Sequence, residues 1–208
     1  IGSSAGVAVS GGATLAGAGT VGAVTIASGA TISPGNTAGV AGTLNVNGAA
    51  TLVGTNVCDI TGTGGTDCDK IAASGAVTAS STLTINLPTS APTGFNQATS
   101  YSWTIMSGSS VNIANMALGT TWTASGTFAL TTSGNTVVVT YTAPKPATPT
   151  GLTASDGSSA TQVAVSWNAV TGATSYELFR NTANNFAGAS SIYSGATASY
   201  NDTGAAPG

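Results

Sequence analysis

Apolar and polar residues alternate over short runs along this chain, and glycine separates one run from the next. Leu83, Ile85 and Leu87 alternate with polar residues, which is typical of a β-strand with one buried face. The continuous apolar run 137–139 is typical of a strand that is covered on both faces. Apolar residues at helical spacing are almost absent, so we expect an all-β fold. The pattern predicts strands at 24–26, 43–46, 82–87, 100–106, 122–123, 128–130 and 136–142.

A short motif recurs in the first third of the chain. Residues 9–15 (VSGGATL) return as 26–32 (IASGATI) and 46–52 (VNGAATL), at steps of roughly 17 to 20 residues, and 72–78 (AASGAVT) form a weaker copy. Each copy places a β-type stretch, a turn of small residues and a second β-type stretch in the same order. A unit this short cannot bury its own apolar face, so successive copies must stack. The repeat therefore predicts a β-solenoid, which is a long, rigid and passive object.

A proline-rich stretch divides the chain. Residues 143–148 (APKPAT) lead into Pro149, and their prolines lack the N–H that a central strand needs and stiffen the chain. The sequence before this stretch is repetitive and rich in glycine, and the sequence after it changes in character. We expect a solenoid domain at 1–142, a linker at 143–148 and a second domain at 149–208. The charged residues that follow the linker are Asp156, Glu177, Arg180 and Asp202.

The N-terminal region resembles a known surface-protein repeat. Residues 32–39 (ISPGNTAG) and 42–48 (GTLNVNG) are similar to the "SPGN…G-T-L-x-V-x-G" signature of the passenger-associated repeat of bacterial autotransporters. The continuation, from Asp69-Lys70-Ile71 to 82–85 (TLTI), is similar to the stretch that follows in those proteins. The resemblance covers roughly residues 1–142, weakens after Leu87, and implies a short right-handed parallel β-helix. The chain departs from the family pattern in the loop between Cys58 and Cys68.

The C-terminal region resembles a fibronectin type III domain. Residues 149–154 (PTGLTA), 163–167 (VAVSW), 172–180 (GATSYELFR) and 200–204 (YNDTG) are similar to strands A, B, C and the end of E. The resemblance implies an incomplete β-sandwich that lacks the last two strands and has open edges. Either the polypeptide continues, or another molecule supplies those strands. In the second case, the edge strands near Tyr193 and Tyr200 are the expected contacts between subunits.

Composition excludes several classes of function. Only 4% of residues are charged and the net charge is −3, so the chain lacks the basic surface of a nucleic-acid-binding protein. Histidine is absent, which excludes Ser–His and Cys–His catalytic arrangements. No apolar run approaches the roughly 20 residues of a membrane-spanning helix. Residues 62–65 are rich in glycine but lack the lysine of a phosphate-binding loop. We expect neither enzymatic activity nor a cofactor.

One loop gathers both cysteines and half of the acidic residues. Cys58 and Cys68 bracket it, and in an exported protein such a pair predicts a disulfide, worth roughly 2–3 kcal/mol for a loop of this size. Asp59, Asp67 and Asp69 are typical of solvated turns. Two alternatives remain open for these carboxylates: a weak calcium site, or a carboxylate pair for glycoside cleavage.

Four aromatic residues lie between the repeat and the linker: Tyr101, Trp103, Trp122 and Phe128. We expect them to cap the end of the solenoid and shield its open edge. The alternative is a strip of rings that stacks on sugars. In the C-terminal region, Trp167 and Tyr176 are expected in the core, and Arg180 is expected to form an exposed pair with Glu177 that contributes little stability.

The sequence predicts an exported protein of the extracellular space or the cell surface. We expect a structural role as a stalk, a fibre or filament subunit, or an adhesive passenger, acting by rigidity, display and self-association. The low charge is consistent with contacts between copies. The alternative is a polysaccharide-binding surface module, whose partners are glycans, or a β-helix enzyme that acts on polysaccharides.

Overall fold

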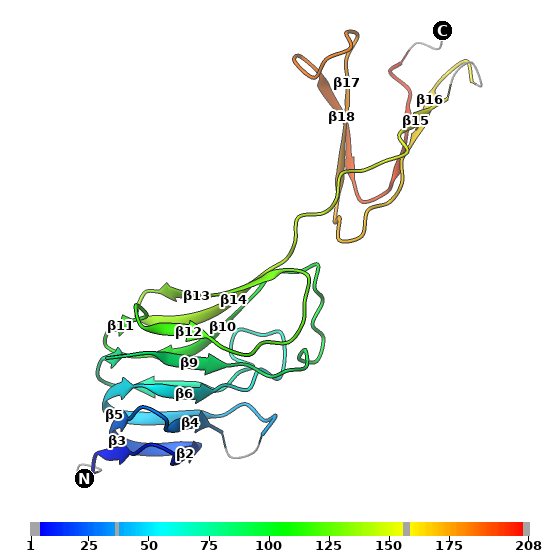
Figure 1. The fold of residues 1–208 in the computed structure, drawn as a ribbon. Coiled ribbons are helices and arrows are strands. Elements are labelled where there is room, and N and C mark those ends of the chain that lie inside the picture. Colours follow the sequence, from blue (N-terminus) through cyan, green and yellow to red (C-terminus); the bar gives the residue numbers. More distant parts are fainter. Residues whose placement is uncertain (1–4, 36–37, 156–158, 206–208) are drawn as a thin grey trace. The chain divides into compact units, whose positions relative to one another are not determined.

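A computed structural model describes residues 5–35, 38–155 and 159–205. These residues form strands β1 to β19 and no helix, so the predicted all-β class is confirmed. Consequently, the described part of the chain holds no helix that could cross a membrane. The chain divides into two compact units, Ile1–Pro144 (unit 1) and Lys145–Gly208 (unit 2), which are described separately (Figure 1).

The larger sheet of unit 1 has nine strands. They are β1 (Val7–Val9), β3 (Gly19–Ile26), β5 (Thr43–Leu52), β7 (Lys70–Ala73), β8 (Val77–Thr78), β10 (Tyr101–Ser107), β11 (Val111–Asn112), β13 (Thr127–Ser133) and β14 (Thr136–Thr142). From β1 to β10 the neighbouring strands are parallel. β14 is antiparallel to both of its neighbours, β10 and β13. The hairpin of β13 and β14 therefore ends the parallel series.

The smaller sheet of unit 1 has five strands, all parallel. They are β2 (Thr14–Gly17), β4 (Thr31–Pro34), β6 (Gly54–Val57), β9 (Leu83–Asn86) and β12 (Met116–Leu118). The chain alternates between the sheets, so that β1 leads to β2, β3 to β4, and β5 to β6. Figure 1 shows the strands of the smaller sheet one above another. Successive passes of the chain are thus stacked by parallel pairing, as a short repeat requires.

Strand register places equivalent residues of successive passes in columns. Ile32 and Ile85 lie on the inner side of the smaller sheet and are 0% exposed. Neighbouring positions carry a ladder in which Thr14 pairs with Thr31, Thr31 with Thr55, and Thr55 with Thr84. Because side chains alternate between the faces of a strand, these threonines point away from the core. The larger sheet has a similar ladder, formed by Ala8, Thr25, Thr51, Thr78 and Asn112.

The recurring motif occupies two different corners of the stack. Copies 9–15 and 26–32 carry the chain from the larger sheet to the smaller one, and Gly12 and Gly29 make the turn with positive φ angles of 81° and 75°. Copy 46–52 instead lies within β5 and pairs with the second half of β3. Copy 72–78 pairs with the equivalent part of β5. Both corners bring main chains close together, so both select glycine and alanine.

The core of unit 1 follows the predicted alternation. Leu83, Ile85 and Leu87 are 0%, 0% and 4% exposed, and the whole run 137–139 is buried, so both predictions are confirmed. Six of the predicted strands overlap β3, β5, β9, β10, β13 and β14. The predicted strand at 122–123 is wrong, because these residues lie in the loop between β12 and β13. Trp122 suggested a strand because it is a large apolar residue, but its ring reaches the core from a loop.

Unit 2 has two small antiparallel sheets. One contains β15 (Thr153–Ala154), β16 (Val163–Ser166) and β19 (Ser199–Asp202), and the other β17 (Tyr176–Arg180) and β18 (Ser190–Gly195). The Trp167 ring, which follows β16, lies 5.4 Å from the ring of Tyr176 and 6.1 Å from that of Tyr193, centroid to centroid. These contacts place Trp167 between the two sheets.

Candidate functional site

The loop with both cysteines contains free thiols, so the predicted disulfide is wrong. Cys58 Sγ lies 3.6 Å from the carbonyl oxygen of Asp69, and Cys68 Sγ lies 3.4 Å from that of Thr104. The thiols therefore donate weak hydrogen bonds to different carbonyls. Both side chains are buried in the core of unit 1, where free cysteine packs as a small apolar residue.

Their surroundings keep both thiols protonated. Burial raises the pKa of Cys58 well above its usual 9.0, and electrostatic interactions with Cys68, Asp69 and Asp59 raise it further. Burial also raises the pKa of Cys68 to about 12, with a smaller contribution from Asp69 that the charge of Lys70 opposes. Because the thiolate is the nucleophile and the metal ligand, these cysteines are inert at neutral pH.

Asp69 is a buried carboxylate that accepts hydrogen bonds from two separate segments of the chain. Its Oδ1 accepts the N–H of Gly42 at 2.8 Å, and its Oδ2 accepts the N–H of Asp59 at 3.1 Å. Its residue is 1% exposed, and this burial raises the pKa of Asp69 from 3.8 to about 6. The two hydrogen bonds oppose that shift, and the charge of Asp59 adds to it. Asp69 therefore shares its site with one further carboxylate and two buried thiols.

Two glycines of the segments 32–39 and 42–48 lie close to Asp69. Gly35 has a φ of 94°, and a Cβ on it would lie 2.9 Å from Asp69 Oδ1. A Cβ on Gly42 would lie 2.5 Å from the Cα of Gly35. Glycine is thus required at both positions by close approach of the main chain. Asn36 and Thr37 of the same signature lie outside the described residues.

The other two carboxylates also bind backbone N–H groups. Asp59 Oδ2 accepts the N–H of Gly39 at 2.6 Å, and Asp67 Oδ2 accepts that of Gly64 at 2.8 Å on an exposed turn. Among the described residues, no group of three or more His, Cys, Asp or Glu side chains could hold a metal ion. The structure brings Asp59 and Asp69 together and leaves Asp67 apart, which is the arrangement of a structural loop.

The four predicted aromatic residues lie in one cluster at the β13–β14 end of unit 1. Trp103 and Trp122 are 0% and 2% exposed, with ring centroids 5.8 Å apart, and Phe128 lies 4.7 Å from Trp122. Tyr101 stacks on Trp103 at 5.7 Å. Two rings this deeply buried have no free face for a sugar, so Trp103 and Trp122 cannot form a glycan-stacking strip in the folded chain.

Two members of the aromatic cluster were missed from the sequence. Phe95 lies 4.9 Å from Tyr141 and 5.3 Å from Trp122, centroid to centroid. The Tyr141 hydroxyl donates to the carbonyl of Gln97 at 2.8 Å and accepts the N–H of Gly126 at 3.0 Å. Tyr141 thereby joins two loops to β14. The available signal was Tyr141 itself, two residues after the buried valine run and on the same side of the strand as Val139.

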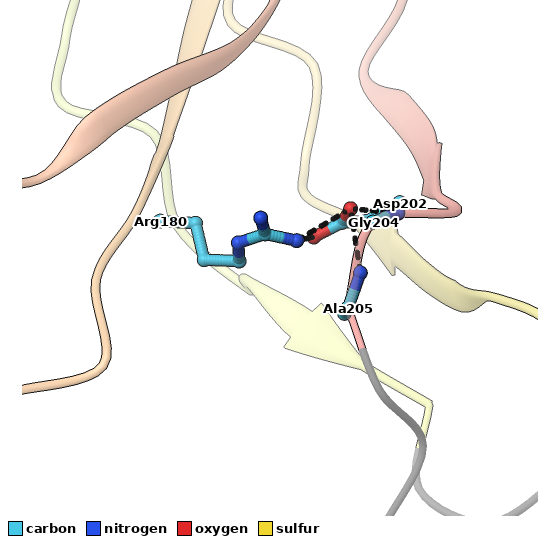
Figure 2. Close-up of polar contacts among 4 residues, drawn as sticks. All are labelled: Arg180, Asp202, Gly204 and Ala205. Atoms are coloured by element: carbon cyan, nitrogen blue, oxygen red, sulfur yellow. Dashed lines mark hydrogen bonds and ion pairs between the residues drawn. The ribbon is translucent and has the colours of Figure 1, made fainter.

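In unit 2, Arg180 pairs with Asp202 and not with Glu177 as expected. Arg180 Nη1 donates to both carboxylate oxygens of Asp202, at 2.9 and 2.8 Å, and Figure 2 shows this fork. Positions 177 and 180 of one strand point to opposite faces, so Glu177 does not lie beside Arg180. Asp202 also accepts the N–H groups of Gly204 and Ala205 at 2.9 and 3.1 Å. The pair connects β17 to β19 and so links the two sheets.

Tyr193 and Tyr200 lie on β18 and β19, with ring centroids 5.1 Å apart. In the described residues, each of these strands pairs with a neighbour on one side only. The Tyr193 hydroxyl accepts the N–H of Thr197 at 3.0 Å, which holds the turn between the two strands. Both tyrosines therefore lie on edge strands and pack against each other.

An apolar groove in unit 2 was not predicted from the sequence. It has a volume of about 180 Å³ and is lined by Pro149, Leu152, Trp167, Tyr176, Glu177 and Leu178. Leu152 is 65% exposed beside it. The buried Nε1 of Trp167 has no hydrogen-bond partner among the described residues. The available signal was Leu152 itself, a large apolar residue in an otherwise small and polar stretch.

No protein family matches this chain, and no curated protein matches it.

Proposed function

We propose that this chain is a structural protein of the extracellular space or cell surface, which acts by rigidity, display and self-association. The observation that carries the proposal is the aligned parallel pairing of unit 1, where one pass of the chain stacks on the next from β1 to β12. The outward columns of that stack consist largely of threonine and small residues. Such a surface suits a passive scaffold, and its location outside the cell is inferred from the resemblance to autotransporter passengers.

In this proposal, residues 1–142 are a short parallel β-helix, 143–148 are a linker, and 149–208 are a fibronectin type III-like sandwich that lacks two strands. Strands that alternate between two parallel sheets support the first assignment. The antiparallel sheets that enclose Trp167 support the last. The β-helix supplies stiffness, because each inner strand is held by main-chain hydrogen bonds on both sides.

Self-association is supported by the strands at the ends of the sheets. β1, β2, β12 and β13 leave one side unpaired in the described residues. None of them contains a charged residue or a proline, the features that usually prevent edge strands from pairing with other chains. With only 4% charged residues in the chain, little electrostatic repulsion opposes contact between copies.

Sedimentation velocity and electron microscopy over a concentration series test this proposal. We expect ordered assemblies that grow with concentration. Ala129→Lys, which adds a charge to the exposed edge of β13, is expected to weaken assembly. Asn45→Lys adds the same charge to an exposed position of the central strand β5 and is the matched control. A wild-type chain that stays monomeric throughout, or that binds a neutral polysaccharide without assembling, would contradict the proposal and favour the glycan-binding alternative.

A further inference from the structure

We infer that the apolar groove of unit 2 receives an uncharged β-strand from a second copy of this chain, which pairs with the free edge of β17. The inference rests on the proposed self-association and adds a surface of unit 2 to the edge strands of unit 1. Two independent features of the groove meet at one place: an open apolar hollow and a strand with an unpaired edge.

The hollow is apolar and open to water. Pro149, Leu152 and Leu178 line its walls, and Leu152 is 65% exposed. In unit 1, by contrast, the inward apolar residues Leu83 and Ile85 are 0% exposed. An apolar side chain that is left in water does not gain the free energy of burial. An apolar side chain that entered the hollow would recover part of it.

β17 borders the hollow and has an unpaired edge. Tyr176, Glu177 and Leu178 are consecutive residues of β17, and all three line the groove. β17 pairs with β18 on one side, and no described strand pairs with it on the other. Unpaired main-chain N–H and C=O groups beside an apolar hollow are recognised by an extended strand, which supplies hydrogen bonds from its backbone and alternate side chains to the pocket.

The charge of the groove favours a second copy as the source of the strand. Glu177 is the one charged residue of the lining, so a strand without acidic residues fits best. This chain is 4% charged and rich in such strands. Each copy carries both a groove and uncharged strands, so the contact is heterologous and builds a ring or an open filament. We place this contact at β17, and the edges of β18 and β19 that carry Tyr193 and Tyr200 stay a separate prediction.

Leu152→Asp tests this inference in the full chain. The side chain is largely exposed, so the change is expected to preserve the fold, as checked by circular dichroism. Phe186→Asp, at a residue 73% exposed and outside the groove lining, is the matched control. We expect wild type and Phe186→Asp to assemble alike, and Leu152→Asp to raise the concentration needed for half-assembly at least about tenfold. Wild-type assembly that Leu152→Asp leaves unchanged overturns the inference but not the proposed function. A wild-type chain that never assembles overturns both.

Hydrogen exchange provides a second readout. In assembled wild type, the amides of β17 are expected to exchange at least about tenfold more slowly than in the Leu152→Asp chain at the same concentration. Assemblies in which β17 exchanges as fast as in the monomer, while β13 or β1 becomes protected, place the contact in unit 1 and overturn the inference.

Discussion

The two units bury the apolar side chains of their short strands to different extents. Unit 1 stacks its passes so that residues such as Ile71 and Leu83 are 0% exposed. In the described part of unit 2, Trp167 is the one buried apolar side chain, while Leu152 and Phe186 are 65% and 73% exposed. The difference shows that parallel stacking provides a covered core from within the chain, whereas two small antiparallel sheets do not.

The units also differ in what joins their parts. In unit 1, one continuous apolar core connects both sheets, and an aromatic cluster lies at the β13–β14 end. In unit 2, the fork between Arg180 and Asp202 is a polar link between sheets. An ion pair with a partly exposed arginine contributes little stability, and it excludes less water than an apolar core does. Unit 2 is therefore the part that gains most from a further strand.

Truncation of a core side chain is expected to give the largest difference between the two units in the free energy of unfolding that is lost. Ile85→Ala removes a fully buried side chain of unit 1 and is expected to lower the free energy of unfolding of that unit by about 4 kcal/mol. Leu178→Ala, at a half-buried position of unit 2, is expected to cost about 1 kcal/mol. Urea titrations followed by circular dichroism and tryptophan fluorescence measure both. Equal losses would show that unit 2 is as well packed as unit 1.

The reactivity of the Cys58 and Cys68 thiols measures how well the core of unit 1 is shielded from solvent. Because both are buried and their pKa values are raised, alkylation of the native chain is expected to be at least about 100-fold slower than that of the unfolded chain. After unfolding without reductant, a thiol-specific reagent should titrate both cysteines. Fast modification in the native state would contradict a closed core, and absence of titratable thiol after unfolding would restore the disulfide.

The pH dependence of unit 1 is expected to follow Asp69. Burial raises its pKa from 3.8 to about 6, so the folded chain binds this proton more tightly than the unfolded chain does. Its contribution to stability is therefore full below about pH 4 and is lost as the pH rises through 6, by roughly 2–3 kcal/mol. Asp69→Asn is expected to lose the hydrogen bond from the Asp59 N–H at every pH. Because asparagine does not titrate, this variant should also lose the dependence of the free energy of unfolding on pH. The same slope in both proteins, measured by urea unfolding between pH 4 and 7, would assign it to other groups.

The smallest of these effects is expected at the polar link of unit 2. Asp202→Ala removes the partner of Arg180 and leaves the N–H groups of Gly204 and Ala205 without their acceptor. We expect a loss of about 1–2 kcal/mol in unit 2 and none in unit 1. Arg180→Ala should cost less, because the arginine side chain is 43% exposed. A loss from Arg180→Ala that exceeds the loss from Asp202→Ala would show that the ion pair, not the turn, holds this link.

Periodicity predicted the strands whose side chains alternate strictly, because alternation records which face is buried. Leu83, Ile85 and Leu87 were placed correctly for that reason, as was the run 137–139. The repeat also indicated stacking. It did not reveal that copies 26–32 and 46–52 lie at different corners, because every tight corner of this stack selects the same small residues.

Features that depend on contacts between distant segments were not predictable. Asp69 is buried because Gly35 and Gly42 come close to it, which no local pattern encodes. The disulfide was inferred from the spacing of Cys58 and Cys68, but the direction of each thiol is set by the surrounding carbonyls. The groove beside β17 depends on which strand edges remain unpaired, and that is a property of the sheets as a whole.

Native-state hydrogen exchange on the unassembled chain tests the contrast between the units most directly. The amides of β5, β7 and β9 are expected to exchange only through global opening of unit 1, at least about 100-fold more slowly than those of β16 and β17. That result would show that unit 1 is closed by its own residues and that unit 2 is not. Equally slow exchange in the strands of both units would contradict the account, because unit 2 would then be complete without a second copy.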